Sequence, residues 1–366
     1  MNRVKTSYSK EDVDVLLKDI TGKIEYLNNE TREKVIQNGG HYSEMLPIEY
    51  EPSKEYEELY NEALDKFGYK TYTALANVSE KIILEKGKNV VLVSLARAGT
   101  PIGILIKRYL KFVYNYDIPH YTISIIRDRG LDINAMKYIL DRYKAEDIQF
   151  VDGWTGKGAI LNELKKEVNE KFPNVSSELA VLSDPANICK LSGTHEDFLI
   201  PSSCLNSTVS GLISRTVLNK DLIDVANGDF HGATYHEEME HKDVSLEFLN
   251  KIESCFSRCD CYKIYMSAVK EYYDLEEDSL TGMEEALRIK ERENVSNINF
   301  VKPGIGETTR VLLRRVPWKI LVKDLNDTER LGHIFRLAKE KNVDVVEDKS
   351  LVRYNCIGII KDMADT

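Results

Sequence analysis

The stretch Ile148-Gln149-Phe150-Val151-Asp152-Gly153-Trp154-Thr155-Gly156-Lys157-Gly158-Ala159-Ile160 decides the fold of this chain. An apolar run ends on Asp152, and a loop of Gly, Thr and Lys then opens a helical pattern. Glycines let backbone N–H groups approach an anion, and the positive end of the following helix favours negative charge. The stretch therefore predicts a strand, a phosphate-binding loop and a helix, as in an α/β domain.

A second loop has the same build. The apolar run 90–95 ends at Ala96-Arg97-Ala98-Gly99-Thr100, and residues 104–110 then read as a helix. Small residues flank a single Arg, whose planar guanidinium matches phosphate oxygens. One such loop is an ordinary connection between a strand and a helix, but two on separate strands of one domain indicate a site for a phosphate ligand.

Apolar runs and helical patterns alternate through the middle of the chain. The expected strands are 90–95, 121–126, 148–152 and 178–183, and the expected helices are 101–113, 132–144 and 157–171. This order predicts a parallel sheet whose ligands bind at the carboxyl ends of the strands. We divide the chain into a helical N-terminal region (1–69), an α/β core (70–245), a helical connector (246–295) and a small α/β domain (296–366).

The two loops resemble those of type I phosphoribosyltransferases, which use 5-phosphoribosyl-1-pyrophosphate (PRPP). The resemblance implies transfer from PRPP with Mg²⁺, with Asp152 on the ribose and Arg127 and Arg129 on a mobile catalytic loop. The family usually has a second acid where this chain has Gly153. The substrate-binding residues implied are Arg97, Ala98, Gly99, Thr100, Gly153, Thr155, Gly156, Lys157 and Gly158.

Longer runs resemble one family more closely. His41-Tyr42-Ser43-Glu44-Met45-Leu46-Pro47, His120-Tyr121-Thr122-Ile123-Ser124-Ile125-Ile126-Arg127 and the segment 197–212 are similar to the StiP family of bacterial tellurite-resistance and stress gene clusters. That family is often labelled a cysteine protease, whereas its loops resemble PRPP enzymes. We expect a phosphoribosyltransferase-like enzyme that makes a nucleotide-like metabolite; the alternatives are a cysteine peptidase and a PRPP or nucleotide sensor without catalysis.

The segment around Cys204 separates these alternatives. It is rich in small polar residues, and with Asp184, Ser203 and Asn206 it would form a specificity pocket for a base in the transferase. In a peptidase, Cys204 would be the nucleophile, with His195 or His120 as its base. A lone Cys beside apolar residues is more often packed than reactive.

The C-terminal segment reads as a separate domain. It resembles the Pelota-type RNA-binding domain, in which a Gly-containing loop and the helix that it opens contact the RNA backbone. The residues expected to bind RNA are Gly304, Glu307, Thr309, Arg310 and Arg314. A small α/β module that only dimerises is the alternative for this segment.

Charge and cysteine content limit the function further. The 366 residues carry a net charge of −10, yet residues 296–366 contain 13 Lys and Arg against 10 Asp and Glu. RNA is therefore expected at the C-terminal segment only. The six cysteines have no paired spacing, so we expect no structural zinc site, and no long apolar run indicates a membrane. We expect a cytoplasmic protein of undetermined oligomeric state.

Overall fold

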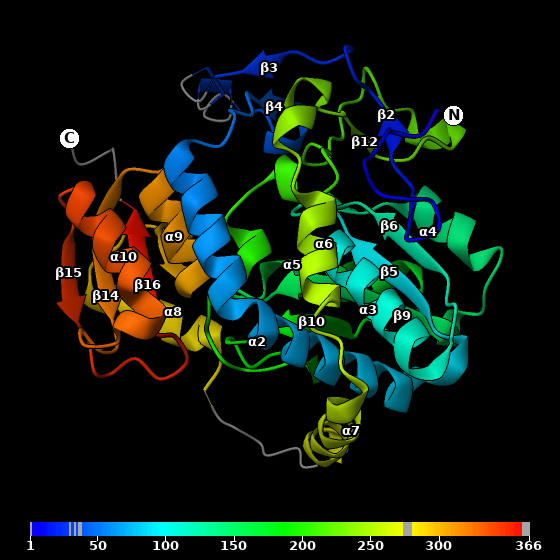
Figure 1. Cartoon of the computed structure of the whole chain (residues 1–366). Helices are drawn as coiled ribbons and strands as arrows, with labels where there is room; N and C mark the ends of the chain where they lie inside the picture. Colours follow the sequence, from blue (N-terminus) through cyan, green and yellow to red (C-terminus); the bar gives the residue numbers. More distant parts are fainter. Residues whose placement is uncertain (1, 29–30, 33, 36–38, 274–279, 361–366) are drawn as a thin grey trace.

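A parallel sheet forms the centre of the molecule (Figure 1). The computed structural model describes the chain except for residues 1, 29–30, 33, 36–38, 274–279 and 361–366. The strand order is β1-β6-β5-β9-β10-β11, and every neighbouring pair is parallel. The strands are β1 (Asp14–Val15), β5 (Val91–Leu95), β6 (His120–Ile123), β9 (Ile148–Trp154), β10 (Leu179–Ser183) and β11 (Leu191–Ser192). The predicted α/β class and parallel sheet are confirmed.

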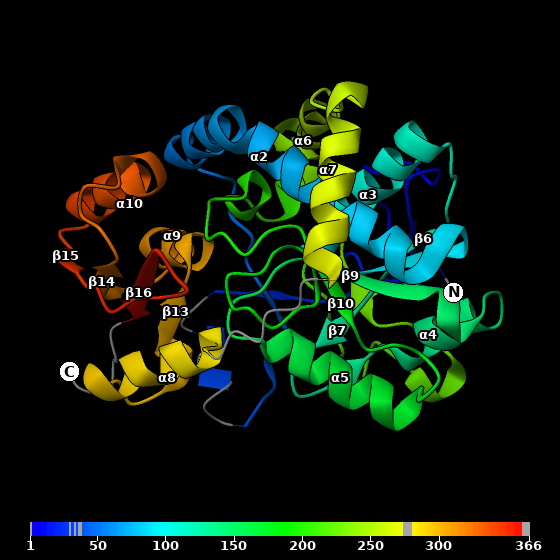
Figure 2. The same ribbon diagram turned by 90° about the horizontal axis from the view of Figure 1, so that it is seen from below.

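Helices cover both faces of this sheet (Figures 1 and 2). Successive residues of a strand point to opposite faces, so Leu92 packs in the cluster of α2 and α3, and Val91 and Val93 pack in the cluster of α4 and α5. α7 packs against α2, and α6 packs against both α2 and α3. The helices are α2 (Lys54–Lys86), α3 (Gly99–Tyr114), α4 (Ile133–Leu140), α5 (Ala159–Lys171), α6 (Ser245–Glu253) and α7 (Arg258–Tyr273).

Only part of the N-terminal region (1–69), which was predicted to be helical, forms a helix. Residues 14–15 form the edge strand β1, and the Ser9 hydroxyl accepts a hydrogen bond from Glu11 N, which closes a turn. The side chains of Val13, Val15, Leu16 and Leu17 are all buried, and an extended segment buries them on both of its sides. One continuous helix, α2, crosses the predicted boundary at residue 69.

Several shorter elements surround the core. β2 (Lys18–Asp19) pairs with β12 (Gly232–Ala233), and β3 (Tyr26–Leu27) pairs with β4 (Leu46–Pro47). The expected strand 121–126 stops at Ile123, because β7 (Ile125–Ile126) turns into a hairpin with β8 (Gly130–Leu131). The 3-10 helices are Tyr42–Glu44, Gly87–Asn89, Ala145–Asp147, Pro201–Ser203, Ser207–Val209, Val225–Asn227, Glu237–Lys242 and Ile298–Phe300.

The C-terminal domain is a four-stranded sheet with helices. Its strand order is β13-β16-β14-β15, and β16 runs antiparallel to both of its neighbours. Ala286 and Ile289 of α8 share a buried cluster with Val301 and Ile357, so this domain begins at α8 rather than at residue 296 as predicted. Its elements are α8 (Gly282–Arg292), β13 (Val301–Pro303), α9 (Ile305–Arg314), β14 (Pro317–Val322), α10 (Thr328–Glu340), β15 (Asp344–Glu347) and β16 (Cys356–Ile360).

Polar contacts join the C-terminal domain to the core. The Arg336 guanidinium of α10 makes two hydrogen bonds, of 3.0 and 3.1 Å, to the Glu62 carboxylate of α2. The Tyr354 hydroxyl donates to Gly156 O at 2.7 Å, next to the glycine-rich loop. The glycine-rich loop therefore lies against the C-terminal domain. Among the described helices, none is both long and apolar enough to cross a bilayer.

Candidate functional site

The loop after β9 has the predicted strand, loop and helix geometry. Gly158 precedes α5 with φ 86°, in the left-handed region that favours glycine. The Thr155 hydroxyl donates to the buried Asp184 carboxylate, whose other oxygen accepts the N–H groups of Ile188 and Cys189 at 2.8 Å. Asp184 is fully buried. The structure therefore places Asp184 behind the loop as a support, not at a surface that a substrate could reach.

Asp152 and Lys157 lie in one cavity at the carboxyl end of β9, as predicted. The Asp152 carboxylate accepts the N–H of Gly153 at 2.7 Å, and burial raises its pKa to about 7. The Lys157 ammonium donates to Ile298 O and Val301 O of the C-terminal domain, at 2.5 and 2.9 Å. Burial, Lys302 and Arg127 lower its pKa to about 8. The loop lysine thus binds the neighbouring domain directly.

Only some residues of the loop after β5 lie at the cavity. Ala98 lines the same cavity, but the Arg97 guanidinium turns to Ile213 O at 3.0 Å and to the buried Glu49 carboxylate at 3.6 Å. Gly99 is required because an added Cβ would lie 2.5 Å from Val151 O. Thr100 is buried and accepts a hydrogen bond from the Thr122 hydroxyl at 3.1 Å. Arg97 is therefore not brought to the cavity with Asp152.

The two arginines of the turn after β7 have different surroundings. Arg127 lines the cavity and pairs with Asp128 at 3.3 Å. Arg129 pairs instead with Glu44 at 2.9 Å. Gly130, which follows the two arginines, is tightly packed, because an added Cβ would lie 2.2 Å from a Glu167 carboxylate oxygen. Only Arg127 of this pair is positioned to meet a ligand in the cavity.

The cavity has a volume of about 720 Å³, within the usual range of roughly 300–1,000 Å³ for small-ligand sites. Its walls come from the core, the N-terminal region and the C-terminal domain. Four further residues of the wall have no local motif that predicts them, because they lie on separate segments: Arg32, Tyr42, Arg215 and Lys302. The predicted residues found here are Ala98, Arg127, Asp152, Thr155, Gly156, Lys157, Gly158 and Glu307.

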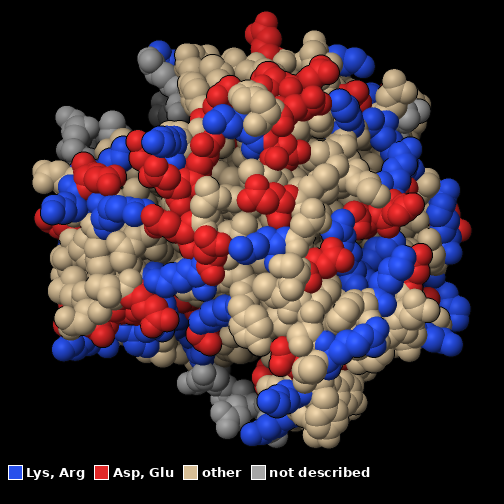
Figure 3. Space-filling view, viewed as in Figure 1, with Lys and Arg blue, Asp and Glu red and all other residues tan. Residues whose placement is uncertain are grey.

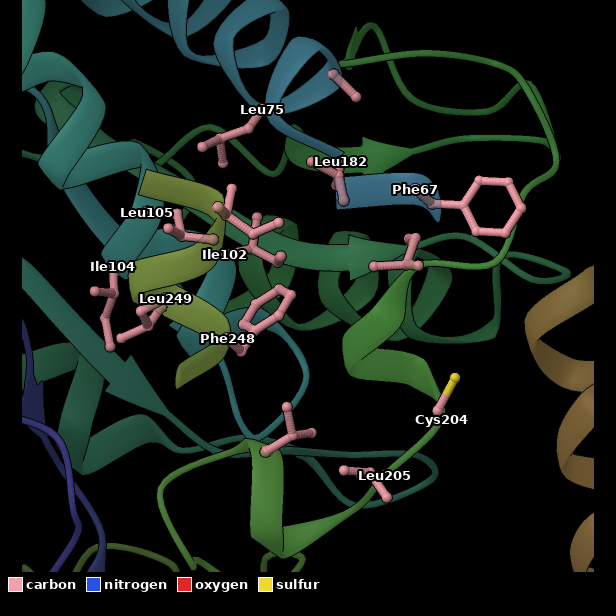
Figure 4. Packing of buried hydrophobic residues seen from close by; sticks show 14 of the residues in the cluster. Phe67, Leu75, Ile102, Ile104, Leu105, Leu182, Cys204, Leu205, Phe248 and Leu249 are labelled. Atoms are coloured by element: carbon pink, nitrogen blue, oxygen red, sulfur yellow. The ribbon is translucent and has the colours of Figure 1, made fainter. Parts of the chain in front are cut away.

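Cys204 lies outside this cavity. Its side chain is 1 % exposed and sits at the edge of the apolar cluster that faces the C-terminal domain (Figure 4). Its neighbour Ser203 accepts a hydrogen bond from Arg310 Nε at 3.2 Å through its carbonyl oxygen. Asn206 lines a second cavity, of about 550 Å³, together with Glu49. Cys204, Ser203 and Asn206 therefore lie apart from Asp152 and Lys157.

The two histidines proposed as bases contact oxygen atoms. His120 lies between the Ser94 hydroxyl and Asp12 O, both at 2.8 Å, and burial lowers its pKa to about 4. His195 contacts Asp184 O at 2.9 Å and the Ser192 hydroxyl at 3.2 Å. In this conformation both imidazoles have partners other than a thiol.

Three of the predicted RNA-binding residues, Gly304, Glu307 and Arg310, lie next to the core. Gly304 and Thr309 are buried, and the Thr309 hydroxyl donates to Ile305 O at 2.7 Å. Arg310 lies over the Trp154 ring, 5.0 Å from its centroid, and contacts Glu307 at 3.3 Å. The Arg314 side chain falls outside the described part of the chain. The edge of α9 expected to meet RNA thus borders the cavity of Asp152.

Comparisons with known proteins match both parts of the chain. Residues 6–253 match the family described as tellurite-like stress resistance cysteine protease StiP, and residues 280–362 match the PELOTA RNA binding domain. The chain is 34% identical to "Cysteine protease StiP" of Acinetobacter baylyi (strain ATCC 33305 / BD413 / ADP1) over 98% of its own length and 94% of the relative's. The C-terminal domain resemblance is thereby confirmed.

Solved structures resemble the chain only weakly. A SepCysS–SepCysE N-terminal domain complex is 12% identical with a TM-score of 0.25, covering 94% of this chain and 91% of that one. A PLP-bound aminotransferase from Clostridium difficile 630 is 10% identical with a TM-score of 0.21, covering 94% and 93%. Neither similarity assigns the core to the type I phosphoribosyltransferase fold.

The expectation of phosphoribosyl transfer from PRPP is wrong by these comparisons. Both the matching family and the relative are named as cysteine proteases. The Mg²⁺ ion was expected only as a companion of PRPP, and no three metal-ligating side chains gather among the described residues. Since the family match spans residues 6–253 and the relative aligns over nearly the whole chain, this protein belongs to the StiP family.

Proposed function

We propose that this chain is a cysteine peptidase with Cys204 as its nucleophile. The proposal is supported by the name of the relative that aligns with 98% of the chain. Of the six cysteines, Cys189 and Cys204 lie within the residues that match the family. Burial and the nearby Asp184 carboxylate raise the pKa of the Cys189 thiol, which disfavours the nucleophilic thiolate. Cys204 is the thiol that remains.

The position of Cys204 makes access the decisive step. In peptide hydrolysis the thiolate attacks the scissile carbonyl, the amine leaves, and water then cleaves the thioester. A side chain that is 1 % exposed meets no peptide, so the loop 201–210 has to open first. The contact of Arg310 with Ser203 O holds this loop on the C-terminal domain. Peptidase activity is therefore expected to depend on how the C-terminal domain packs against the core.

The test is hydrolysis of fluorescent casein by the full chain. Cys204→Ala should abolish cleavage, whereas Cys259→Ala, which removes an exposed thiol of α7, should leave it unchanged. Mass spectrometry after treatment with a thiol-directed probe should locate slow labelling at Cys204 and fast labelling at Cys259. Cleavage by Cys204→Ala at the wild-type rate would refute the assignment of the nucleophile.

RNA binding is the second proposed function, and it is favoured by the match of residues 280–362 to the PELOTA RNA binding domain. The expected interaction is electrostatic, because the segment 296–366 is basic while the whole chain is acidic. Fluorescence anisotropy of a labelled hairpin RNA with the full chain tests it. Binding should weaken steeply with salt, and absence of any salt-dependent binding would leave the domain as a docking element.

A further inference from the structure

The cavity around Asp152 has more basic than acidic side chains. Six basic residues line it, namely Arg32, Arg127, Lys157, Arg215, Lys302 and Arg315. Three acids face them, Asp128, Asp152 and Glu307, and the raised pKa of Asp152 leaves that group partly protonated at neutral pH. The cavity therefore carries a surplus of about three positive charges inside a protein of net charge −10.

The positive charges lie close together inside the cavity. On the face in Figure 3, Lys and Arg are interspersed with Asp and Glu. Inside the cavity, burial, Arg315, Arg127 and Arg310 lower the pKa of Lys302, and the Glu307 carboxylate offsets this effect only in part. Among the described residues, the Lys302 ammonium has no hydrogen bond or ion pair. Such crowding costs stability unless an anion neutralises it.

A second group of cations shows the same crowding. Burial and the nearby Arg32 lower the pKa of Arg215 to about 10. The Arg215 guanidinium donates to Met45 O at 3.0 Å and lies 5.3 Å from the centroid of the Tyr42 ring. Two cationic groups, one around Lys302 and one around Arg215, therefore line a single cavity. A ligand with more than one anionic group matches this arrangement.

The C-terminal domain supplies part of the cavity wall. Asn299, Lys302, Pro303, Glu307 and Arg315 all come from the segment that matches the RNA-binding domain. Lys157 and Tyr354 hold that segment against the glycine-rich loop. Any RNA that reaches the basic edge of α9 would therefore also meet the loop of the core.

We propose that this cavity binds phosphate groups of a single-stranded RNA segment, such as an end or an extruded nucleotide, held by the C-terminal domain. The inference rests on the proposed RNA binding. A volume of about 720 Å³ admits one or two nucleotides but not a duplex. The rings of Tyr42 and Trp154 lie in the wall, where an unpaired base can stack. The shared chemistry is phosphate, and RNA is the source that the position of the C-terminal domain favours.

The test compares the full chain with the double variant Lys302→Ala with Arg127→Ala. Its probe is a labelled hairpin RNA with a single-stranded 5′ tail that carries a terminal phosphate. Anisotropy should show affinity lowered at least about tenfold and a salt slope smaller by about one to two, as for lost phosphate contacts on a single strand. The matched control is Lys339→Ala, which removes an exposed lysine of α10 outside the cavity. It should change the affinity less than threefold, which corresponds to about 0.6 kcal/mol of binding free energy. Thermal unfolding checks that each variant is folded.

The outcomes separate this inference from the proposed RNA binding. Absence of RNA binding by the wild type contradicts the RNA-binding function and this inference with it. If the wild type binds RNA and the double variant binds it equally well, the proposal for the cavity is contradicted and the RNA-binding function is not. In a second arm, inorganic phosphate is titrated by calorimetry. Phosphate binding that the double variant loses while its RNA affinity stays unchanged would assign the cavity to small phosphorylated molecules and overturn the RNA source.

Discussion

Replacing Asp197 by Ala is expected to loosen the C-terminal domain from the core. Asp197 is a core residue with a buried side chain, and its two carboxylate oxygens accept the N–H groups of Ile305 and Asn355, both at 2.8 Å. Its own carbonyl oxygen accepts a further bond from the Asn355 side-chain amide at 2.8 Å. Ile305 begins α9, so the carboxylate also meets the positive end of a helix.

The magnitude follows from the two N–H groups that the substitution leaves without a partner. A buried unsatisfied donor costs about 1–3 kcal/mol, so two cost about 2–6 kcal/mol. The native carboxylate has a desolvation cost of its own, since burial raises the pKa of Asp197 to about 6. The net loss should therefore fall near the lower end, about 2–3 kcal/mol.

Hydrogen exchange measures this loss locally. The amides of Ile305 and Asn355 should exchange about 30-fold faster or more in Asp197→Ala, since 1.4 kcal/mol is a factor of ten. The matched control is Asp344→Ala on β15, an exposed acid of the same domain, which should leave both amides protected. Unchanged protection in Asp197→Ala would refute the argument that this carboxylate fastens the two domains.

Two further predictions concern the core. Gly103→Ala should lower the free energy of unfolding by about 1–3 kcal/mol in urea titrations, because the new Cβ would lie 2.1 Å from Ser94 Oγ and 2.4 Å from His120 Nε2; a wild-type midpoint would contradict the close packing of α3 on the sheet. Asp152→Asn should gain stability relative to the wild type as pH rises from about 4 to 8. Between these values the native Asp152, with its pKa of about 7, holds a proton that the unfolded state releases, so its contribution is lost as pH rises through 7. Parallel stability curves for the two proteins would contradict the raised pKa.

Local sequence patterns were enough for the core elements that carry short-range signals. β5, β9 and β10 are apolar runs bounded by turn residues, and α3 and α5 follow loops of small residues, so their order and type are confirmed. The helix prediction for the start of the N-terminal region was wrong because the buried residues there are in contact on two sides of an extended segment. Val13 to Leu17 have the spacing of a short helix, yet pairing of β1 with β6 holds them extended. Such pairing with a strand more than a hundred residues away leaves no local trace.

The candidate site also has features that the sequence predicts and features that depend on the tertiary structure. By itself, the sequence predicted that Asp152, Lys157 and Arg127 lie at the carboxyl ends of strands of one parallel sheet, because these ends share an edge. Only the tertiary structure decided that Arg97 pairs with Glu49 and that Lys157 binds the C-terminal domain. It also decided that Cys204 is buried and that Lys302 and Arg215 share a cavity, since these contacts join segments far apart in the chain. Their cause is the packing of the C-terminal domain and the N-terminal region on the core, which no periodicity or spacing encodes.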